Sequence, residues 1–72
     1  MKQKSISIRT PFIRLDALLK FADIAQSGGE AKVMVQAGEV SVNGEITLMR
    51  GKKCRPGDTI AVSGVTISIT ED

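Results

Sequence analysis

The 72-residue chain contains no histidine, tryptophan or tyrosine, and only one cysteine and two phenylalanines. Without histidine it lacks the side chain that most often serves as a general base or metal ligand near neutral pH. A single cysteine forms no internal disulfide, and a structural zinc site takes about four cysteine or histidine ligands. No apolar run exceeds three residues, which is far short of a membrane span. These absences favour a binding module over an enzyme, and we expect no cofactor, no metal and no membrane partner.

The composition is that of a globular protein, because 42% of the residues are apolar and 25% are charged. A chain of this length has room for one small domain, so we expect a single domain over residues 1–72. The first residues include basic groups but no apolar segment of the kind that secretory signals contain. Together with the lone cysteine, this predicts a cytoplasmic protein.

The basic residues are distributed unevenly, although the formal net charge is only +2. Residues 50–55 carry four basic groups and no acidic group, namely Arg50, Lys52, Lys53 and Arg55. Clustered cations bind polyanions by releasing their counterions, so we interpret this segment as a phosphate-binding loop. The alternative is a solvated loop whose charges favour solubility.

Cys54 lies within the cluster, and the neighbouring cations are expected to lower its pKa. Because no base or second thiol accompanies it, we assign it no catalytic role.

The residue pattern predicts a strand, two helices and then four short strands, which is an α+β domain. Residues 5–8 alternate polar and apolar side chains, the period of a strand. A helical spacing of apolar residues follows, and its start lies either at Pro11 or nearer Arg14. Asp16 and Lys20 would form an ion pair on the outer face of that helix. The apolar residues that define this first helix are Leu15, Leu18, Leu19 and Ala22.

A second helix is expected to begin after Ser27, because serine followed three residues later by Glu30 forms a capping box. Gly38 stands where a left-handed C-terminal cap belongs. From residue 40 the apolar period changes to two, and Asn43-Gly44 is a strong hairpin signal. Residues 56–58 then read as a turn that closes the basic loop. The strands expected in this half of the chain cover residues 40–42, 45–48, 59–62 and 65–69.

The start of the second helix offers further candidate binding groups. Gly28 and Gly29 would allow a phosphate to approach free backbone N–H groups, although the two glycines also suit a flexible connector. Lys32 and Gln36 lie one turn apart on the exposed face of this helix. They either contact the same polyanion or form an ordinary polar face.

The shortage of aromatic residues bears on the kind of nucleic acid. Proteins that bind single strands stack the bases on aromatic rings. Phe12 and Phe21 stand beside the apolar stripes, so we assign both to the core. We therefore expect recognition of the phosphates, 2′-hydroxyls and shape of a folded or double-stranded RNA.

Several segments together resemble the RNA-binding domain named after ribosomal small-subunit protein S4, and the small stand-alone bacterial form known as the YbcJ-like proteins. The resemblance covers roughly residues 12–62 and implies an αL motif, two packed helices followed by a β-hairpin. It also implies RNA contacts at Arg14 and Lys32. Many members carry arginine directly after the connector serine, where this chain has Gly28. The segments concerned are Arg14-Leu15-Asp16 with Leu18-Leu19, Ser27 through Gly44, Arg50 through Lys53 and Pro56 through Ile60.

The sequence thus predicts two packed helices against a small, mostly antiparallel sheet of about four to five short strands. The predicted function is that of a non-catalytic, monomeric RNA-binding module. Its expected partner is a structured RNA of the rRNA or tRNA class, on a ribosome or a ribosomal precursor. The alternative is a protein-interaction adaptor at an RNA-containing complex. The expected RNA-binding residues are Arg14, Gly28, Gly29, Lys32, Gln36, Arg50, Lys52, Lys53 and Arg55.

Overall fold

The computed structural model describes residues 2–72, so Met1, the first residue of the expected domain, lies outside the described residues. Five strands form one sheet in the order β1-β7-β6-β3-β4, and β2 and β5 form a separate pair. Only the β1–β7 pair among these described strands is parallel, which confirms the mostly antiparallel α+β architecture. The elements are β1 (Lys2–Ile8), β2 (Ile13–Arg14), α1 (Leu15–Phe21), α2 (Gly28–Gln36), β3 (Val40–Val42), β4 (Glu45–Ile46), β5 (Lys53–Cys54), β6 (Thr59–Val62) and β7 (Val65–Glu71).

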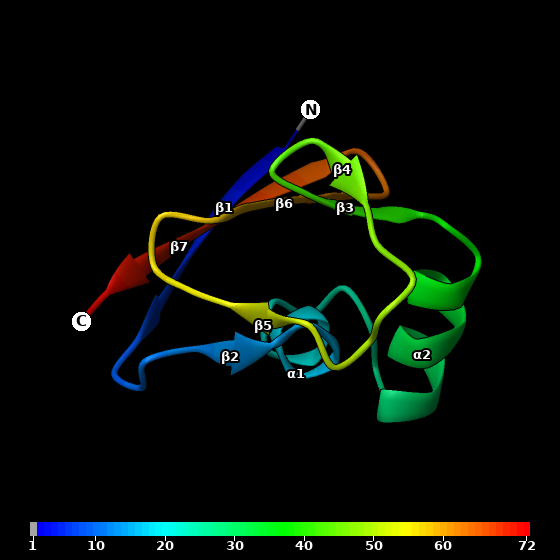
Figure 1. Cartoon of the computed structure of the whole chain (residues 1–72), viewed down its shortest axis with the longest axis horizontal. Helices are drawn as coiled ribbons and strands as arrows, with labels where there is room; N and C mark the ends of the chain where they lie inside the picture. The colour runs from blue at the N-terminus through cyan, green and yellow to red at the C-terminus, as the bar shows by residue number, and fades with distance from the viewer. Residues whose placement is uncertain (1) are drawn as a thin grey trace.

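The core lies between the five-stranded sheet and a layer formed by α1, α2 and the β2–β5 pair (Figure 1). α1 has only seven residues and is too short to be stable alone in water. Its leucines are fully buried, and full burial of one such side chain contributes about 1.5–3 kcal/mol. The packing of these leucines in the core therefore stabilises α1. Neither helix of residues 2–72 is long and apolar enough to cross a membrane.

The first helix begins at Leu15, which selects the later of the two expected starting points. Arg14 provides no side-chain cap. Instead the Leu15 N–H donates to the Lys52 carbonyl (2.9 Å) and the Asp16 N–H donates to the Arg50 carbonyl (2.9 Å). The basic segment therefore caps α1 with its backbone. The prediction that residues 50–55 form a loop is wrong at Lys53–Cys54, which pairs with β2.

Two tight turns fix the register of the sheet. Asn43 and Gly44 both have positive φ (53° and 86°), and so do Ser63 and Gly64 (51° and 75°). Positive φ at both central residues is the geometry that two-residue hairpins favour. The predicted hairpin at Asn43-Gly44 is confirmed, but the returning strand expected over residues 45–48 ends at Ile46.

Candidate nucleic-acid interface

The β2–β5 pair places two cations side by side. Arg14 and Lys53 are direct partners in its antiparallel register, so their side chains leave the same face. The Arg14 guanidinium Nη2 lies 3.3 Å from the Asp16 carboxylate, and the Lys53 ammonium lies 4.9 Å from the centre of the Phe12 ring. Like charges directly opposite each other disfavour a strand pair, and the two contacts counter this effect. An anion bound to both side chains would stabilise the arrangement further.

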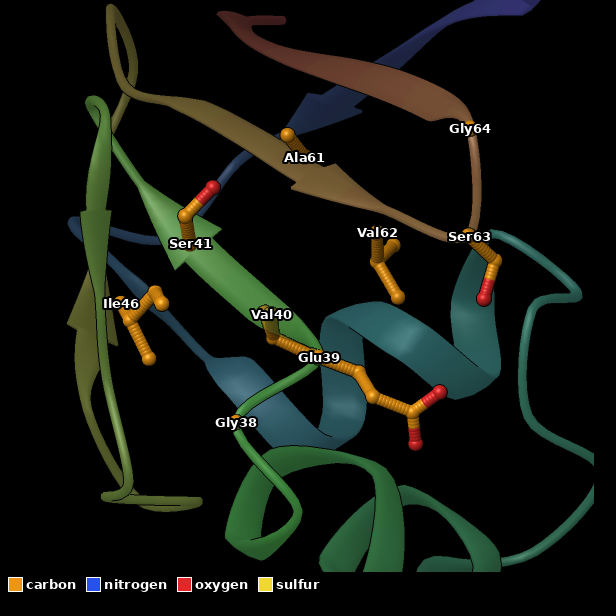
Figure 2. A pocket seen from close by; sticks show the side chains of 9 residues that line it. All are labelled: Gly38, Glu39, Val40, Ser41, Ile46, Ala61, Val62, Ser63 and Gly64. Atoms are coloured by element: carbon orange, nitrogen blue, oxygen red, sulfur yellow. The ribbon is translucent and has the colours of Figure 1, made fainter.

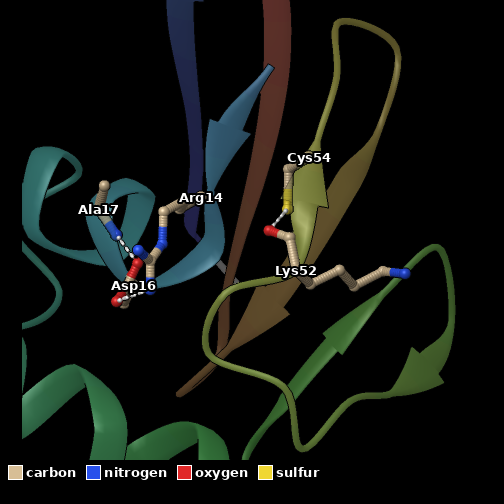
Figure 3. A network of polar contacts seen from close by, with 5 residues as sticks. All are labelled: Arg14, Asp16, Ala17, Lys52 and Cys54. Carbon is tan, nitrogen blue, oxygen red and sulfur yellow. Dashed lines mark hydrogen bonds and ion pairs between the residues drawn. The ribbon is translucent and has the colours of Figure 1, made fainter.

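Backbone contacts hold these cations in place. The carbonyls of Arg50 and Lys52 accept the first two N–H groups of α1, as described above. A Cβ on Gly51 would stand 3.4 Å from Arg14 Nη2, so the guanidinium lies directly over this glycine. Figure 3 shows the Arg14 side chain turned to Asp16, whose other oxygen accepts the Ala17 N–H at 2.8 Å. The position of Arg14 is therefore set by the fold.

An open hollow of about 240 Å³ connects α1 to the start of α2, and its lining residues are Arg14, Asp16, Ala17, Lys20 and Gly28. The Ser27 hydroxyl accepts the Glu30 N–H at 3.1 Å, which confirms the predicted serine cap. Gly28 and Gly29 supply the first amide groups of α2, for which an α-helix has no internal acceptor. A Cβ on Gly28 would meet nothing within 4 Å. The hollow thus combines two cations, the Asp16 carboxylate, the first residue of α2 and open space.

One side of α2 extends from this hollow. Gly28, Lys32 and Gln36 are spaced by four residues and therefore share one side of the helix, and both long side chains are exposed. We define the basic surface as Arg14, Lys20, Gly28, Lys32 and Lys53. Gln36 lies one turn beyond Lys32 on the same side of α2, and Arg50 is exposed beside the first turn of α1.

The other predicted cations lie apart from the basic surface. Lys52 lines a separate hollow of about 300 Å³ against the β3–β4 hairpin, together with the acidic Glu45, and Figure 3 shows its side chain directed away from Arg14. Arg55 precedes the turn into β6, where its N–H donates to Asp58 at 2.8 Å. This turn and α2 lie on opposite sides of the molecule in Figure 1. The nine predicted residues therefore do not form one continuous surface.

A further hollow of about 290 Å³ lies where the end of α2 meets β3 and the β6–β7 turn (Figure 2). Among its lining residues only Glu39 is charged, and Figure 2 shows this carboxylate extending beside Val62 and Ser63. An acidic group without a neighbouring cation repels a polyanion. This hollow therefore does not extend the basic surface.

The predicted environment of Cys54 is wrong. Neighbouring cations are expected to lower its pKa, but the residue is part of β5 and is fully buried in the core. Burial raises the pKa of the thiol to about 11, Asp58 adds to the rise, and Lys52 opposes it. The Sγ donates to the Lys52 carbonyl at 3.7 Å. Because the thiolate is the reactive form, Cys54 is an inert core residue.

Three residues near the site differ from their predicted places. The predicted ion pair of Lys20 with Asp16 is absent from the described residues, because Asp16 pairs with Arg14 and Lys20 lines the hollow instead. Assignment of the phenylalanines to the core is wrong: Phe12 lies only partly buried beneath Lys53, and Phe21 is 66% exposed. The helical spacing carried a signal for Phe21, since it follows Lys20 on α1 outside the apolar stripe of that helix.

Comparisons with known proteins identify relatives of similar length. The probable ribosome maturation protein RlbA of Bacillus subtilis is 46% identical over 59 residues, which cover 82% of this chain and 83% of RlbA. YbcJ of Escherichia coli is 29% identical over 82% of this chain and 84% of its own. Small ribosomal subunit protein uS4 of Akkermansia muciniphila is 36% identical over 52 residues, 72% of this chain but only 26% of that longer protein.

The fold is also similar to that of YbcJ. The solution structure of YbcJ from Escherichia coli, described as revealing an αL motif involved in RNA binding, superimposes with a TM-score of 0.72 at 27% identity. The superposition covers 92% of this chain and 85% of YbcJ. Residues 6–70 match the S4 domain family. On this match, and on the shared architecture of two helices and a small sheet, the chain belongs to the S4 domain family.

Proposed function

We propose that the protein is a non-catalytic RNA-binding domain that holds the phosphate backbone of a structured RNA on its basic surface. The observation that carries the proposal is the placement of Arg14 and Lys53 opposite each other, beside the hollow that is lined by Lys20 and by Gly28, the first residue of α2. Clustered cations and helix-terminal N–H groups are the groups that bind phosphate in nucleic-acid complexes.

Membership of the S4 domain family supports this reading, as does the RNA-binding motif described for YbcJ. The name of RlbA further supports a partner among ribosomal RNAs or their precursors, which is the class of RNA that we propose. The chain would act by binding alone, because its one thiol is buried and burial raises the pKa of that thiol, which leaves little of the reactive thiolate.

Ultraviolet crosslinking in cells that express the protein, followed by sequencing of the attached RNA, tests both parts of the proposal. We expect ribosomal RNA or its precursors to dominate the recovered reads. We also expect recovery to fall in a variant that carries Arg14→Gln and Lys53→Met. Equal recovery from the parent and this variant, or an RNA population that matches total cellular RNA, would contradict the proposal.

A second candidate function is a protein-interaction adaptor, and one observation favours it. Ile46, Leu48 and Met49 are each more than 60% exposed and lie close together in the chain, just before the basic segment. Apolar side chains grouped on a surface often mark a protein contact. Replacing all three with serine separates the functions, because an adaptor would lose its partner whereas affinity for RNA would be unchanged.

A further inference from the structure

Phe21 is the last residue of α1 and the only aromatic side chain of the described residues that is largely exposed, at 66%. Its ring lines an open hollow of about 520 Å³ together with Ile13, Ala17 and Lys20. The wall of this hollow is therefore apolar, and one cation stands at its edge. Exposure of a phenylalanine ring to water costs about 1.5–3 kcal/mol relative to its burial, so an exposed ring suggests a binding role.

The Phe21 hollow is continuous with the basic surface. Ala17 and Lys20 line both this hollow and the neighbouring one that contains Arg14 and Gly28. A ligand that occupies both hollows must be flat and apolar at one end and anionic at the other. A nucleotide has this chemistry, since its base presents a π-face and its phosphate a negative charge.

We propose that the Phe21 hollow accepts an unpaired base of the bound RNA, which stacks on the Phe21 ring while the adjoining phosphate lies between Arg14, Lys20 and the start of α2. The inference rests on the proposed RNA-binding function and adds the kind of RNA feature that is recognised. A base inside a continuous helix is stacked on its neighbours and cannot reach the ring. The preferred RNA is therefore a helix interrupted by a bulge or loop, where bases are free to leave the stack.

A protein segment is the competing occupant of an apolar hollow. Lys20 at the edge and the adjoining Arg14 favour an anionic ligand. A purely apolar segment would leave both cations without a partner, and no acidic side chain lines the Phe21 hollow itself. The exposed aliphatic residues Leu48 and Met49 lie outside both hollows and are better suited to a protein contact.

The test compares two synthetic RNAs in titrations with the full chain. One is a blunt RNA duplex of about 16 base pairs, a length that a small duplex-binding domain covers, and the other is the same duplex with two bulged adenosines. Base stacking on an aromatic ring supports a preference of roughly tenfold for the bulged duplex. Phe21→Leu should abolish this preference and leave affinity for the paired duplex unchanged, whereas Phe21→Trp should retain it.

Leu48→Ala is the matched control, since it removes a similarly exposed apolar side chain outside the hollow. A bulge preference that persists in Phe21→Leu would overturn the inference and favour a protein ligand for the hollow. Equal affinity of the parent for both RNAs would also overturn it, while leaving the proposed function intact. Failure of both RNAs to bind in a salt-dependent manner would instead overturn the proposed function.

A measurement on the unaltered protein removes any dependence on the folding of variants. A 5-bromouridine at the bulge forms a covalent link on irradiation with an aromatic side chain stacked against it. Tryptic digestion should place the link in the peptide that begins at Phe21, because trypsin cleaves after Lys20. A link in the peptide of Phe12, or no link in a complex that binds, would contradict the inference.

Discussion

Arg14 and Lys53 lie directly opposite each other on β2 and β5, so that two positive side chains occupy one face of a two-stranded pair. Each has a compensating neighbour: Asp16 lies 3.3 Å from Arg14, and the Phe12 ring lies 4.9 Å from the Lys53 ammonium. Since like charges directly opposite disfavour a strand pair by roughly 0.2–1 kcal/mol, this arrangement is not explained by stability. The proposed RNA phosphate would account for it, because a negative ligand in contact with both side chains would stabilise the pair of cations.

Substitution of Lys53 should therefore weaken RNA binding more than substitution of its neighbour Lys52. Lys53→Met removes a cation from the basic surface, so RNA affinity should fall roughly fivefold and the salt slope by about one contact. Lys52→Met is the matched control, since Lys52 points to the β3–β4 hairpin, and its affinity should stay within about twofold of the parent. Lys53→Met removes both the unfavourable like-charge contact and the favourable cation–ring contact, and these two effects offset each other. The free energy of unfolding of this variant should therefore stay within about 0.5 kcal/mol of that of the parent. Equal losses of affinity in the two variants would contradict the assignment.

Gly28→Arg should tighten RNA binding. A Cβ at this position meets nothing within 4 Å, so the arginine fits without strain and adds a cation to the hollow of Arg14 and Lys20. We expect an affinity gain of about fivefold and a salt slope steeper by about 0.7 to 0.9. Gly29→Arg carries the same charge about 100° around α2 and serves as the control. The site would be misplaced if Gly29→Arg tightened binding as much as Gly28→Arg.

Most of the fold could be predicted from the sequence because its elements carry strong local signals. The spacing of Leu15, Leu18 and Leu19 repeats with the helical period, and Asn43-Gly44 fits only a turn with positive φ at both positions. The β2–β5 pair could not be predicted in this way. A strand of two residues is too short to show a period, and its pairing depends on how α1 packs.

The errors at Lys53 and Cys54 follow from that missed strand pair. In a strand, successive side chains point to opposite faces. Lys53 therefore faces the basic surface, and Cys54 faces the core. Treated as a loop, the same segment predicts four equivalent cations and a thiol whose pKa these cations lower. The separation of Lys52 from Lys53 and the burial of Cys54 are thus both tertiary effects.

Cys54 should be unreactive in the folded protein. With a pKa of about 11, roughly one thiol in a thousand is ionised at about pH 8, and burial blocks access to it. Alkylation with iodoacetamide, followed by mass spectrometry, should show no modification of native protein over a period that fully modifies protein unfolded in urea. Rapid labelling of the native protein at Cys54 would show that β5 is open in solution.

Asp58 should make the free energy of unfolding depend on pH in the acid range. The Arg55 N–H and the Asn43 side-chain amide donate to its carboxylate, and the Arg55 N–H is the main cause of its lowered pKa. A carboxylate whose folded-state pKa is lowered contributes stability above its ordinary pKa and loses it as the pH falls through the folded-state value. The free energy of unfolding of the parent, measured in urea, should therefore fall as the pH drops below about 4, and that of Asp58→Ala should fall less. An identical acid dependence in the two proteins would show that the turn does not rely on this carboxylate.

The salt dependence of RNA affinity tests the central claim most directly. Four cations of the basic surface, each neutralising one phosphate of a structured RNA, predict that log K falls against log[salt] with a slope of about −3. A variant combining Arg14→Gln with Lys53→Met should reduce the magnitude of that slope by about two contacts, to roughly −1.5, while its melting temperature stays close to that of the parent. A flat response of the parent from low to physiological salt would contradict the claim, and so would a variant that remains folded with an unchanged slope.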